Sequence, residues 1–395
     1  MINFEYYTPT KIAFGRGVES RTGELARAFG AHKALIHYGG KSALASGLIG
    51  RIKASLDAAG VAHVELGGVV PNPHLGKVRE GIELAKREGV DFLIAVGGGS
   101  VIDSAKAIGY GAAEPDHDVW ELYDDAGTRR PAKCLPIGAV LTIAAAGSEM
   151  SNSSVITDEK TGLKRSCKSD LSRPRFAVMD PELTVTLPDF QTQSGCADIL
   201  MHTMERWFNA SGTLELTDAI AAGLMKTVMK NARILRDHPD CYEARAEVMW
   251  ASSLSHNGLT GCGSDGGDWA VHKIEHELGG MFDVTHGAGL AAVWGSWARY
   301  VLPECPKRFA EFAVQVMGVA PAESDEATAR AGIEAVEAYY RSVGMPTNLR
   351  ELGVTPTEQQ IVRMAESAAS VGGGRIGVVR KLDANDIAAI YRAAL

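Results

Sequence analysis

Histidine and aspartate residues at helical spacing are the part of this sequence best suited to chemistry. Asp198 and His202 lie four residues apart in an apolar stretch of helical character, which places both side chains on one helix face. His272 and His276 repeat this spacing, and His286 follows them. A carboxylate with two or three imidazoles suits Fe²⁺, Zn²⁺ or a neighbour in the divalent series, and spacing alone does not choose among them. The set therefore predicts a divalent metal site.

A glycine-rich turn in the N-terminal half predicts a second site, for a dinucleotide. Gly97, Gly98, Gly99 and Ser100 follow the apolar run 92–96 and precede a helical pattern. Glycines let a ligand approach the backbone closely, and the amides at a helix start suit a pyrophosphate. The motif is not G-x-G-x-x-G, so the prediction depends on the general rule that ligands bind at the carboxyl ends of parallel strands. A tight strand-to-helix connection that binds nothing is the alternative.

The second histidine pair also allows a different interpretation. His272-Lys273-Ile274-Glu275-His276 matches the H-x-x-E-H pattern, in which both histidines bind zinc and the glutamate acts as a base. A zinc peptidase is therefore an alternative from another class of enzyme. It would leave the glycine-rich turn and the whole N-terminal half unexplained.

The elements that must position these residues fall into two halves. Up to about residue 180, short apolar runs alternate with helical patterns, which predicts parallel strands with helices on the sheet faces. The expected strands are 33–38, 61–66, 92–96 and 176–179, with helices ending near 59 and 88 and a hairpin over 153–168. Beyond Leu187 strand signals largely stop and helical spacing dominates. We therefore expect an α/β domain over 1–185 and an all-helical domain over 186–395.

Composition and charge exclude several classes of protein. The chain has 395 residues, of which 46% are hydrophobic and 22% charged, as expected for a soluble protein of two domains. Its formal charge of −8 argues against nucleic acid or an anionic membrane as partner. No apolar run approaches the ~18 to 20 residues of a membrane helix, no secretory signal is apparent, and the six cysteines form no C-x-x-C pair. We expect a cytoplasmic protein that acts on small molecules.

Motifs spread through nearly the whole chain resemble those of the iron-containing (group III) alcohol dehydrogenase family. In chain order they are Pro71-Asn72-Pro73, the stretch 97–106, Gly147-Ser148-Glu149, Asp180-Pro181-Glu182-Leu183, Asp198-x-x-x-His202, and His272-x-x-x-His276 with His286. Within the family the chain looks closest to the NADPH-dependent aldehyde reductase and butanol dehydrogenase branch. The resemblance implies an N-terminal dinucleotide-binding domain with a Rossmann-like parallel sheet, an all-helical metal-binding domain, and a cleft between them for cofactor, metal and substrate.

The resemblance also implies roles for individual residues. Asp198, His202, His272 and His286 correspond to the metal ligands, and all four positions are filled, unlike in the metal-free maleylacetate reductases. His276 would lie near the nicotinamide and substrate, where it relays a proton or positions the substrate. The residues expected to bind the cofactor are Gly39, Gly40, Ser42, Asn72, Gly97, Gly98, Gly99, Ser100, Asp103, Thr142 and Lys164.

The end of the first expected strand bears on which nucleotide is used. NAD-selective members of the family tend to carry an aspartate there, which accepts from the ribose 2′-hydroxyl and repels a 2′-phosphate. This chain has Gly39, Gly40, Lys41 and Ser42 instead. The glycines leave room while the lysine and serine offer a charge and a donor, so NADP(H) is favoured over NAD(H). The alternative is that Lys41 is solvated and that both nucleotides are accepted. A separate departure from the family is Ala146, which lacks a hydroxyl that relatives often place against the cofactor.

These expectations combine into a metal-dependent alcohol dehydrogenase or aldehyde reductase. Hydride would pass between NAD(P)H and an aldehyde or primary alcohol bound to one Fe²⁺ or Zn²⁺ ion. Polyol oxidation of the glycerol dehydrogenase kind is the nearest alternative, whereas dehydroquinate synthase would need a basic cluster that is not seen near the ligands. Met150, Leu254 and Trp269 are candidates for a substrate wall. We take a homodimer or a higher homo-oligomer as the default assembly.

Overall fold

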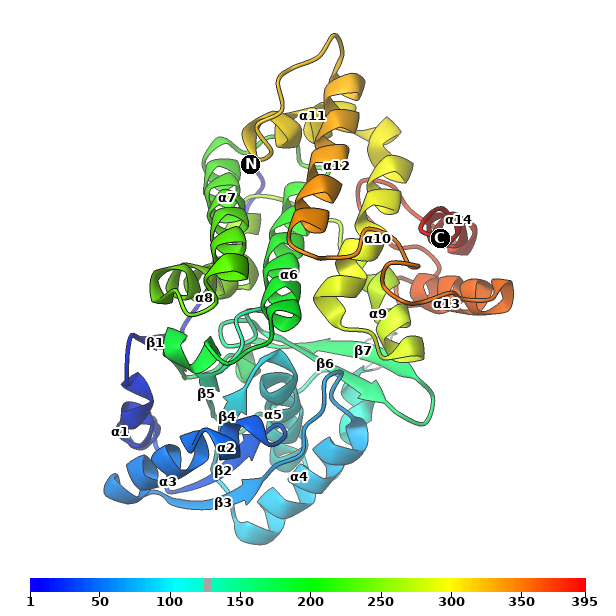
Figure 1. The fold of residues 1–395 in the computed structure, drawn as a ribbon. Helices are drawn as coiled ribbons and strands as arrows, with labels where there is room; N and C mark the ends of the chain where they lie inside the picture. The colour runs from blue at the N-terminus through cyan, green and yellow to red at the C-terminus, as the bar shows by residue number, and fades with distance from the viewer. Residues whose placement is uncertain (124–128) are drawn as a thin grey trace. The chain divides into compact units, whose positions relative to one another are not determined.

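The computed structural model describes residues 1–123 and 129–395, which form two compact units (Figure 1). One unit is Tyr7–Leu187, and the other is Pro188–Leu395 together with Met1–Tyr6. These bounds differ slightly from the expected division at 185/186, and the first six residues join the helical unit instead of the α/β unit. There the Ile2 amide donates to the Gly263 carbonyl at 2.9 Å.

The α/β unit is built on a parallel sheet of six strands. These are β1 (Lys11–Phe14), β2 (Lys33–Tyr38), β3 (Ala62–Leu66), β4 (Phe92–Gly97), β5 (Ile137–Leu141) and β8 (Phe176–Met179), in the order β1-β8-β5-β4-β2-β3. Every neighbouring pair is parallel, so the predicted Rossmann-like sheet is confirmed. The sequence pattern singled out four of these strands and missed β1 and β5.

Helices cover both faces of this sheet, as parallel sheets require. They are α1 (Thr22–Ala28), α2 (Ser42–Ala45), α3 (Leu48–Ala58), α4 (Leu75–Glu88) and α5 (Gly99–Ala113) (Figure 1). Successive strand residues point to opposite faces. Ile36 packs in one core with Ile52 of α3, whereas its neighbour His37 bonds through Nε2 to Ser104 of α5 at 2.9 Å. The expected hairpin is present as β6 (Ser153–Asp158) and β7 (Leu163–Lys168).

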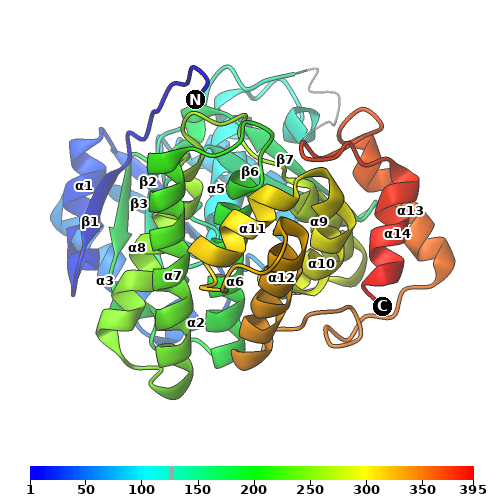
Figure 2. The same ribbon diagram turned by 90° about the horizontal axis from the view of Figure 1, so that it is seen from above.

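The second unit is mostly helical, as predicted. Its helices are α6 (Asp189–Trp207), α7 (Glu215–Asp237), α8 (Tyr242–His256), α9 (Ala270–Phe282), α10 (His286–Val301), α11 (Pro306–Gln315), α12 (Asp325–Ser342), α13 (Glu358–Ser370) and α14 (Ala384–Ala393). Helix α6 is buried on all sides from Thr192 to Trp207 and packs against α7, α8 and α10 (Figure 2). Within the described ranges, no helix has both the length and the apolar character needed to cross a membrane.

Candidate functional site

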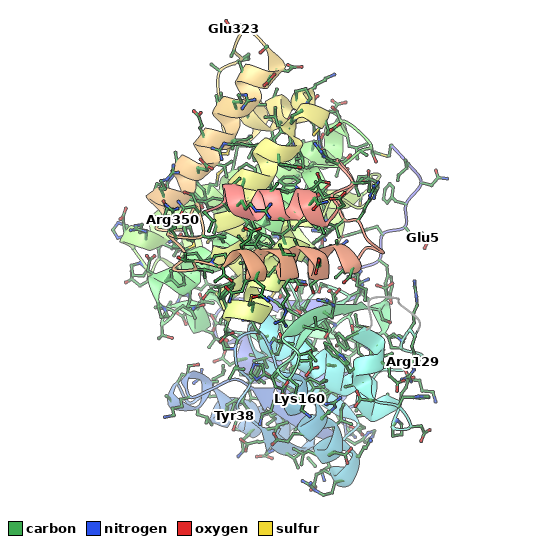
Figure 3. All side chains as sticks on the ribbon, turned by 90° about the vertical axis from the view of Figure 1, so that its right-hand side faces the viewer. Glu5, Tyr38, Arg129, Lys160, Glu323 and Arg350 are labelled. Atoms are coloured by element: carbon green, nitrogen blue, oxygen red, sulfur yellow. The ribbon has the colours of Figure 1, made fainter. Side chains whose placement is uncertain are left out.

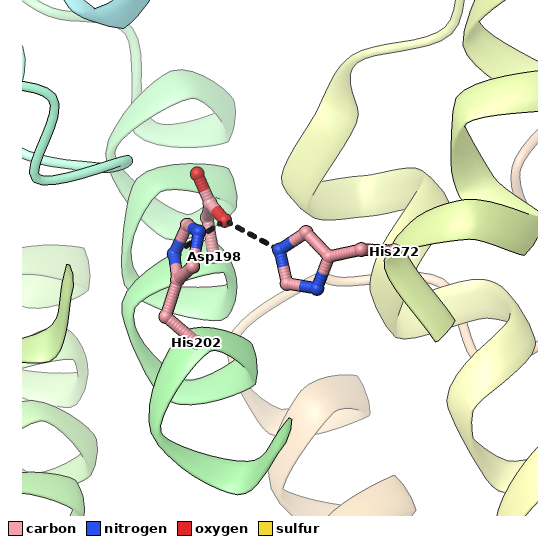
Figure 4. A group of neighbouring side chains, drawn as sticks. All are labelled: Asp198, His202 and His272. Carbon is pink, nitrogen blue, oxygen red and sulfur yellow. Dashed lines mark ion pairs between the residues drawn. The ribbon is translucent and has the colours of Figure 1, made fainter. Parts of the chain in front are cut away.

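Helices α6, α9 and α10 bring the four predicted metal ligands together. Asp198 and His202 lie one turn apart on α6, His272 lies on α9 (Figure 4), and His286 is the first residue of α10. The Asp198 Oδ1 atom is 3.1 Å from His202 Nδ1 and 3.8 Å from both His272 Nε2 and His286 Nε2. A single buried carboxylate oxygen is therefore the common neighbour of three imidazoles.

The atoms at the centre of this cluster fit a divalent cation. Among the described residues, Asp198 Oδ1, His202 Nδ1 and His272 Nε2 are buried without a hydrogen-bond partner, since the 3.1 Å pair lacks hydrogen-bond geometry. A buried polar atom without a partner costs roughly 1–3 kcal/mol. Metal–nitrogen and metal–oxygen bonds of about 2.0–2.2 Å would let these atoms share one ion. The donor set, one carboxylate with imidazoles, is the kind that binds Fe²⁺ or Zn²⁺.

The electrostatics of the cluster also suit a cation. Burial raises the pKa of Asp198, but attraction to His202 and His286 outweighs it and holds that pKa well below its usual range. Burial lowers the pKa of His202 to about 4, against the opposing effect of Asp198. Burial would also lower the pKa of His272, but its interactions with the carboxylates of Asp198 and Glu205 outweigh this effect and raise the pKa to about 9. The ionised Asp198 carboxylate thus favours a positive charge beside it, in a position that is shielded from water.

Two further carboxylates that the sequence analysis did not assign to the metal site lie behind the histidines. Glu205 Oε1 is 3.0 Å from His272 Nδ1 and accepts the His272 backbone N–H at 2.9 Å. Glu275 Oε2 bonds to His286 Nδ1. The spacing could have indicated Glu205, because it follows His202 by three residues on the same helix face. For Glu275, the sequence suggested only the role of a base in the peptidase alternative.

His276 does not belong to the group formed by Asp198, His202 and His272. It groups instead with Glu275 and His286, and its ring centroid is 5.8 Å from that of His286. A peptidase would need His272 and His276 on one zinc ion with Glu275 as the base. Here the Glu275 carboxylate is bonded to His286 instead. It is therefore not placed as the base of a peptidase.

Aromatic side chains border the cluster on the side of His202. The ring of His256, at the end of α8, is centred 4.0 Å from the His202 ring, and Arg206 Nη2 is 3.4 Å from His256 Nδ1. Burial and the cationic charges nearby hold the pKa of His256 well below its usual range. Trp269 lies 5.2 Å from the His272 ring, so this substrate-wall candidate does border the cluster. His256 was not predicted, because its relation to His202 depends on the packing of α8 against α6.

The predicted dinucleotide turn lies at the carboxyl end of β4. Gly97 ends the strand, Gly98 is extended, and α5 begins at Gly99. A Cβ atom on Gly98 would lie 3.0 Å from Ile143, and one on Gly99 would lie 3.1 Å from the Ala146 Cβ, so the turn packs closely on the segment after β5. No side chain in the described structure caps α5, and its first amides keep their capacity to bind an anion.

Other predicted cofactor residues follow neighbouring strands at the same sheet edge. Gly39, Gly40 and Ser42 come after β2, whose last residue Tyr38 is labelled in Figure 3, and Thr142 comes after β5. The three strands adjoin in the order β5-β4-β2, so their carboxyl ends lie together. A Cβ on Gly40 would meet nothing within 4 Å.

The remaining predicted cofactor residues differ in their surroundings. Asn72 is buried with a left-handed φ of 54°, and Lys164 is a buried residue of β7. Asp103 bonds within the protein: its carboxylate accepts from Ser148 Oγ and, at 3.0 Å, from the Val155 amide. Asp103 therefore holds the 148–155 segment against α5, and its contact with the nucleotide stays a prediction.

Comparison with known families agrees with the fold and the site. Residues 9–181 match the model of the iron-containing alcohol dehydrogenases, and residues 192–395 match that of the C-terminal region of the Fe-containing alcohol dehydrogenase family. The chain therefore belongs to the iron-containing alcohol dehydrogenase family and is an NAD(P)-dependent alcohol dehydrogenase. This membership excludes the zinc peptidase alternative.

Individual relatives match over nearly their full length. The chain is 38% identical over 393 residues to the NADH-dependent butanol dehydrogenase A of Clostridium acetobutylicum, covering 99% of each chain. It is 33% identical over 357 residues to the NADPH-dependent aldehyde reductase YqhD of Escherichia coli, covering 90% of each. The crystal structure of NADH-dependent butanol dehydrogenase A from Thermotoga maritima superposes with a TM-score of 0.95 at 38% identity, covering 100% of this chain and 99% of that one.

Proposed function

We propose that this alcohol dehydrogenase interconverts small aldehydes and primary alcohols, prefers NADP(H) to NAD(H), and holds one Fe²⁺ or Zn²⁺ ion. The observation that carries the proposal is the group of buried donor atoms around Asp198 Oδ1. The substrate class follows the similar proteins, which are named butanol dehydrogenase and aldehyde reductase.

The proposed ligands to the ion are Asp198, His202, His272 and His286. A divalent cation supplies Lewis acidity toward a carbonyl oxygen. The carboxylate of Asp198 contributes the negative charge, and the imidazoles complete a set of oxygen and nitrogen donors. Trp269 beside His272 offers an apolar surface to the carbon chain of a small substrate.

We assign the transfer of the proton to His276. It follows His272 by one helical turn, so its side chain leaves α9 on the same face, and it is partly exposed. An imidazole can take up or give back a proton during turnover. Contact with solvent lets His276 exchange that proton with water.

We assign the nucleotide to the carboxyl edge of the parallel sheet. The amides of Gly98, Gly99 and Ser100 at the start of α5 suit the pyrophosphate. Similar proteins are named both NADH-dependent and NADPH-dependent, so overall similarity does not choose between the nucleotides. The end of β2 favours NADP(H), because it carries the exposed Lys41 and open space at Gly40. We also propose a homodimer, because closed twofold symmetry is the commonest assembly, and a cytoplasmic location, because of the composition.

The test is to strip the purified protein of metal, reload it anaerobically with Fe²⁺ or Zn²⁺, and follow butanal reduction with NADPH and NADH. We expect oxidation of NADPH that depends on the metal and is clearly faster than oxidation of NADH. Equal rates with both nucleotides would contradict the cofactor preference alone. Faster reverse reaction with glycerol than with butanol would favour polyol oxidation, and no nucleotide consumption with any metal would contradict the substrate class.

A further inference from the structure

We infer that Glu205 and Glu275 are positioning residues that orient His272 and His286 toward the ion, an inference that rests on the metal site proposed above. Both residues are almost fully buried, with 1% of Glu205 and 0% of Glu275 exposed. Each one bonds to the Nδ1 atom of a different histidine. The unfavourable burial of two extra charges needs an explanation, because carboxylates are seldom buried without a specific partner.

The Glu205 carboxylate fixes both the ring and the backbone of His272. The same Oε1 atom accepts the backbone N–H at 2.9 Å and lies 3.0 Å from Nδ1. The backbone of Glu205 is held as well, since its carbonyl accepts from the Asp268 amide at 2.9 Å. Gly267 makes this contact possible: a Cβ atom there would lie 2.3 Å from the Glu205 carbonyl oxygen. The segment entering α9 is therefore packed directly on α6 at Glu205.

The Glu275 carboxylate has a corresponding relation to His286. It extends from α9 to the first residue of α10 and bonds to Nδ1 of that histidine. Gly289 provides the room, because a Cβ atom there would lie 2.9 Å from Glu275 Cγ and 3.0 Å from Oε1. A larger residue at position 289 would therefore press on the Glu275 side chain.

The chemistry of these contacts decides which ring nitrogen faces the ion. An ionised carboxylate only accepts hydrogen bonds, so the Nδ1 atom that faces it carries the hydrogen. The lone pair then belongs to Nε2, which in both histidines points to Asp198 Oδ1 at 3.8 Å. A carboxylate behind a ligating histidine fixes the ring, selects the tautomer and raises the basicity of the donor nitrogen. Glu205 and Glu275 thus prepare two Nε2 atoms for one cation.

The test replaces each glutamate by alanine and by glutamine and measures metal affinity. Binding of Zn²⁺ and Co²⁺ is followed by competition with a chromophoric chelator, and the absorption spectrum of bound Co²⁺ reports the ligand geometry. We expect E205A and E275A to lose about 10- to 100-fold in affinity and to change the Co²⁺ spectrum. E205Q and E275Q should lose less, about threefold or more, because the amide oxygen still accepts from Nδ1.

Glu277→Gln is the matched control. Glu277 is also buried on α9, but it is turned about 200° around the helix from Glu275. Affinity within twofold of wild type in folded E205A and E275A would overturn the inference. Should an alanine variant not fold, unchanged affinity and an unchanged Co²⁺ spectrum in its glutamine counterpart would overturn it equally. Wild-type protein that binds neither ion would overturn the metal site itself, whereas bound metal without dehydrogenase activity would contradict only the proposed function.

Discussion

At the residue scale, the site is organised around one oxygen atom, Asp198 Oδ1. Three imidazole nitrogens face it from three helices, and two glutamates stand behind the outer pair. Such a set is cooperative, because loss of one donor leaves the remaining buried polar atoms without a partner. Single substitutions should therefore act on metal binding and on turnover together.

The substitution His272→Ala should lower metal occupancy and alcohol dehydrogenase activity together, each by about 100-fold or more, since one donor of the ion is removed. Metal content by mass spectrometry, steady-state rates and NADPH titration by fluorescence would measure the three properties. NADPH binding should remain largely intact. The exposed His238→Ala serves as the control, and full activity in H272A would overturn the ligand assignment.

Charge at the end of β2 gives a second prediction at this scale. Lys41→Glu should lower the ratio of kcat/KM for NADPH over NADH by about tenfold, since a carboxylate repels the 2′-phosphate that the ammonium attracts. Lys160→Glu, at the exposed tip of the β6–β7 hairpin (Figure 3), makes the same charge change elsewhere. If K41E and K160E shifted the ratio equally, general charge and not Lys41 would set the preference.

At the element scale, local pattern predicted β2, β3, β4 and β8 and missed the edge strand β1 and the short, fully buried strand β5. β4 is an unbroken buried run, and β2 and β8 are similar, so their apolar character is visible in the sequence. β1 has four residues at the sheet edge, and its main partner is β8, far along the chain. Its stability comes from that distant pairing, which no local window contains. For Glu205, the spacing from His202 was a local signal, but its contact with His272 of another helix was not visible in the sequence.

A pair of adjacent glycines tests the packing of α9 on α6. Gly267→Ala should lower the free energy of unfolding by about 3 kcal/mol or more, because a Cβ atom would lie 2.3 Å from the Glu205 carbonyl oxygen and φ is +93°. Gly266→Ala has nearly the same backbone, with φ of +94°, but its Cβ would meet nothing within 4 Å, so about 1–2 kcal/mol of strain should be its whole effect. Equal losses in urea denaturation would show that the close approach has no energetic importance.

At the scale of the whole molecule, the change from alternating strands and helices to helices alone predicted the two-part architecture, and the Asp and His spacings singled out four residues that the structure brings together. It could not predict the membership of Met1–Tyr6 in the helical unit, which depends on contacts such as that of Ile2 with Gly263. Two units also mean that unfolding need not be a single transition. Each unit therefore needs its own probe of stability.

The stability of the α/β unit should depend on pH through His37. Burial lowers its pKa to about 4, against the backbone bond to Leu66, which raises it. Between pH 6.5 and 4, His37 is protonated in the unfolded chain but not in the folded chain. The free energy of unfolding therefore falls as the pH falls through this window. The contribution between pH 7.5 and 5 is about 2 kcal/mol.

His37→Asn keeps a donor for the Leu66 carbonyl and removes the titration. Urea denaturation of both proteins at pH 7.5 and 5, followed by a probe in the α/β unit, measures the difference in slope. We expect the pH dependence of the variant to be about 2 kcal/mol smaller than that of wild type. Identical dependence in both proteins would show that His37 is not the group responsible.

The backbone hydrogen bond between Ile2 and Gly263 has a consequence for folding during synthesis. Segment 1–6 leaves the ribosome well before its partner, which is synthesised about 260 residues later. The α/β unit between them can fold meanwhile, whereas the first segment waits for the helical half. An affinity tag fused before Met1 would accordingly be carried next to the loop that leads into α9.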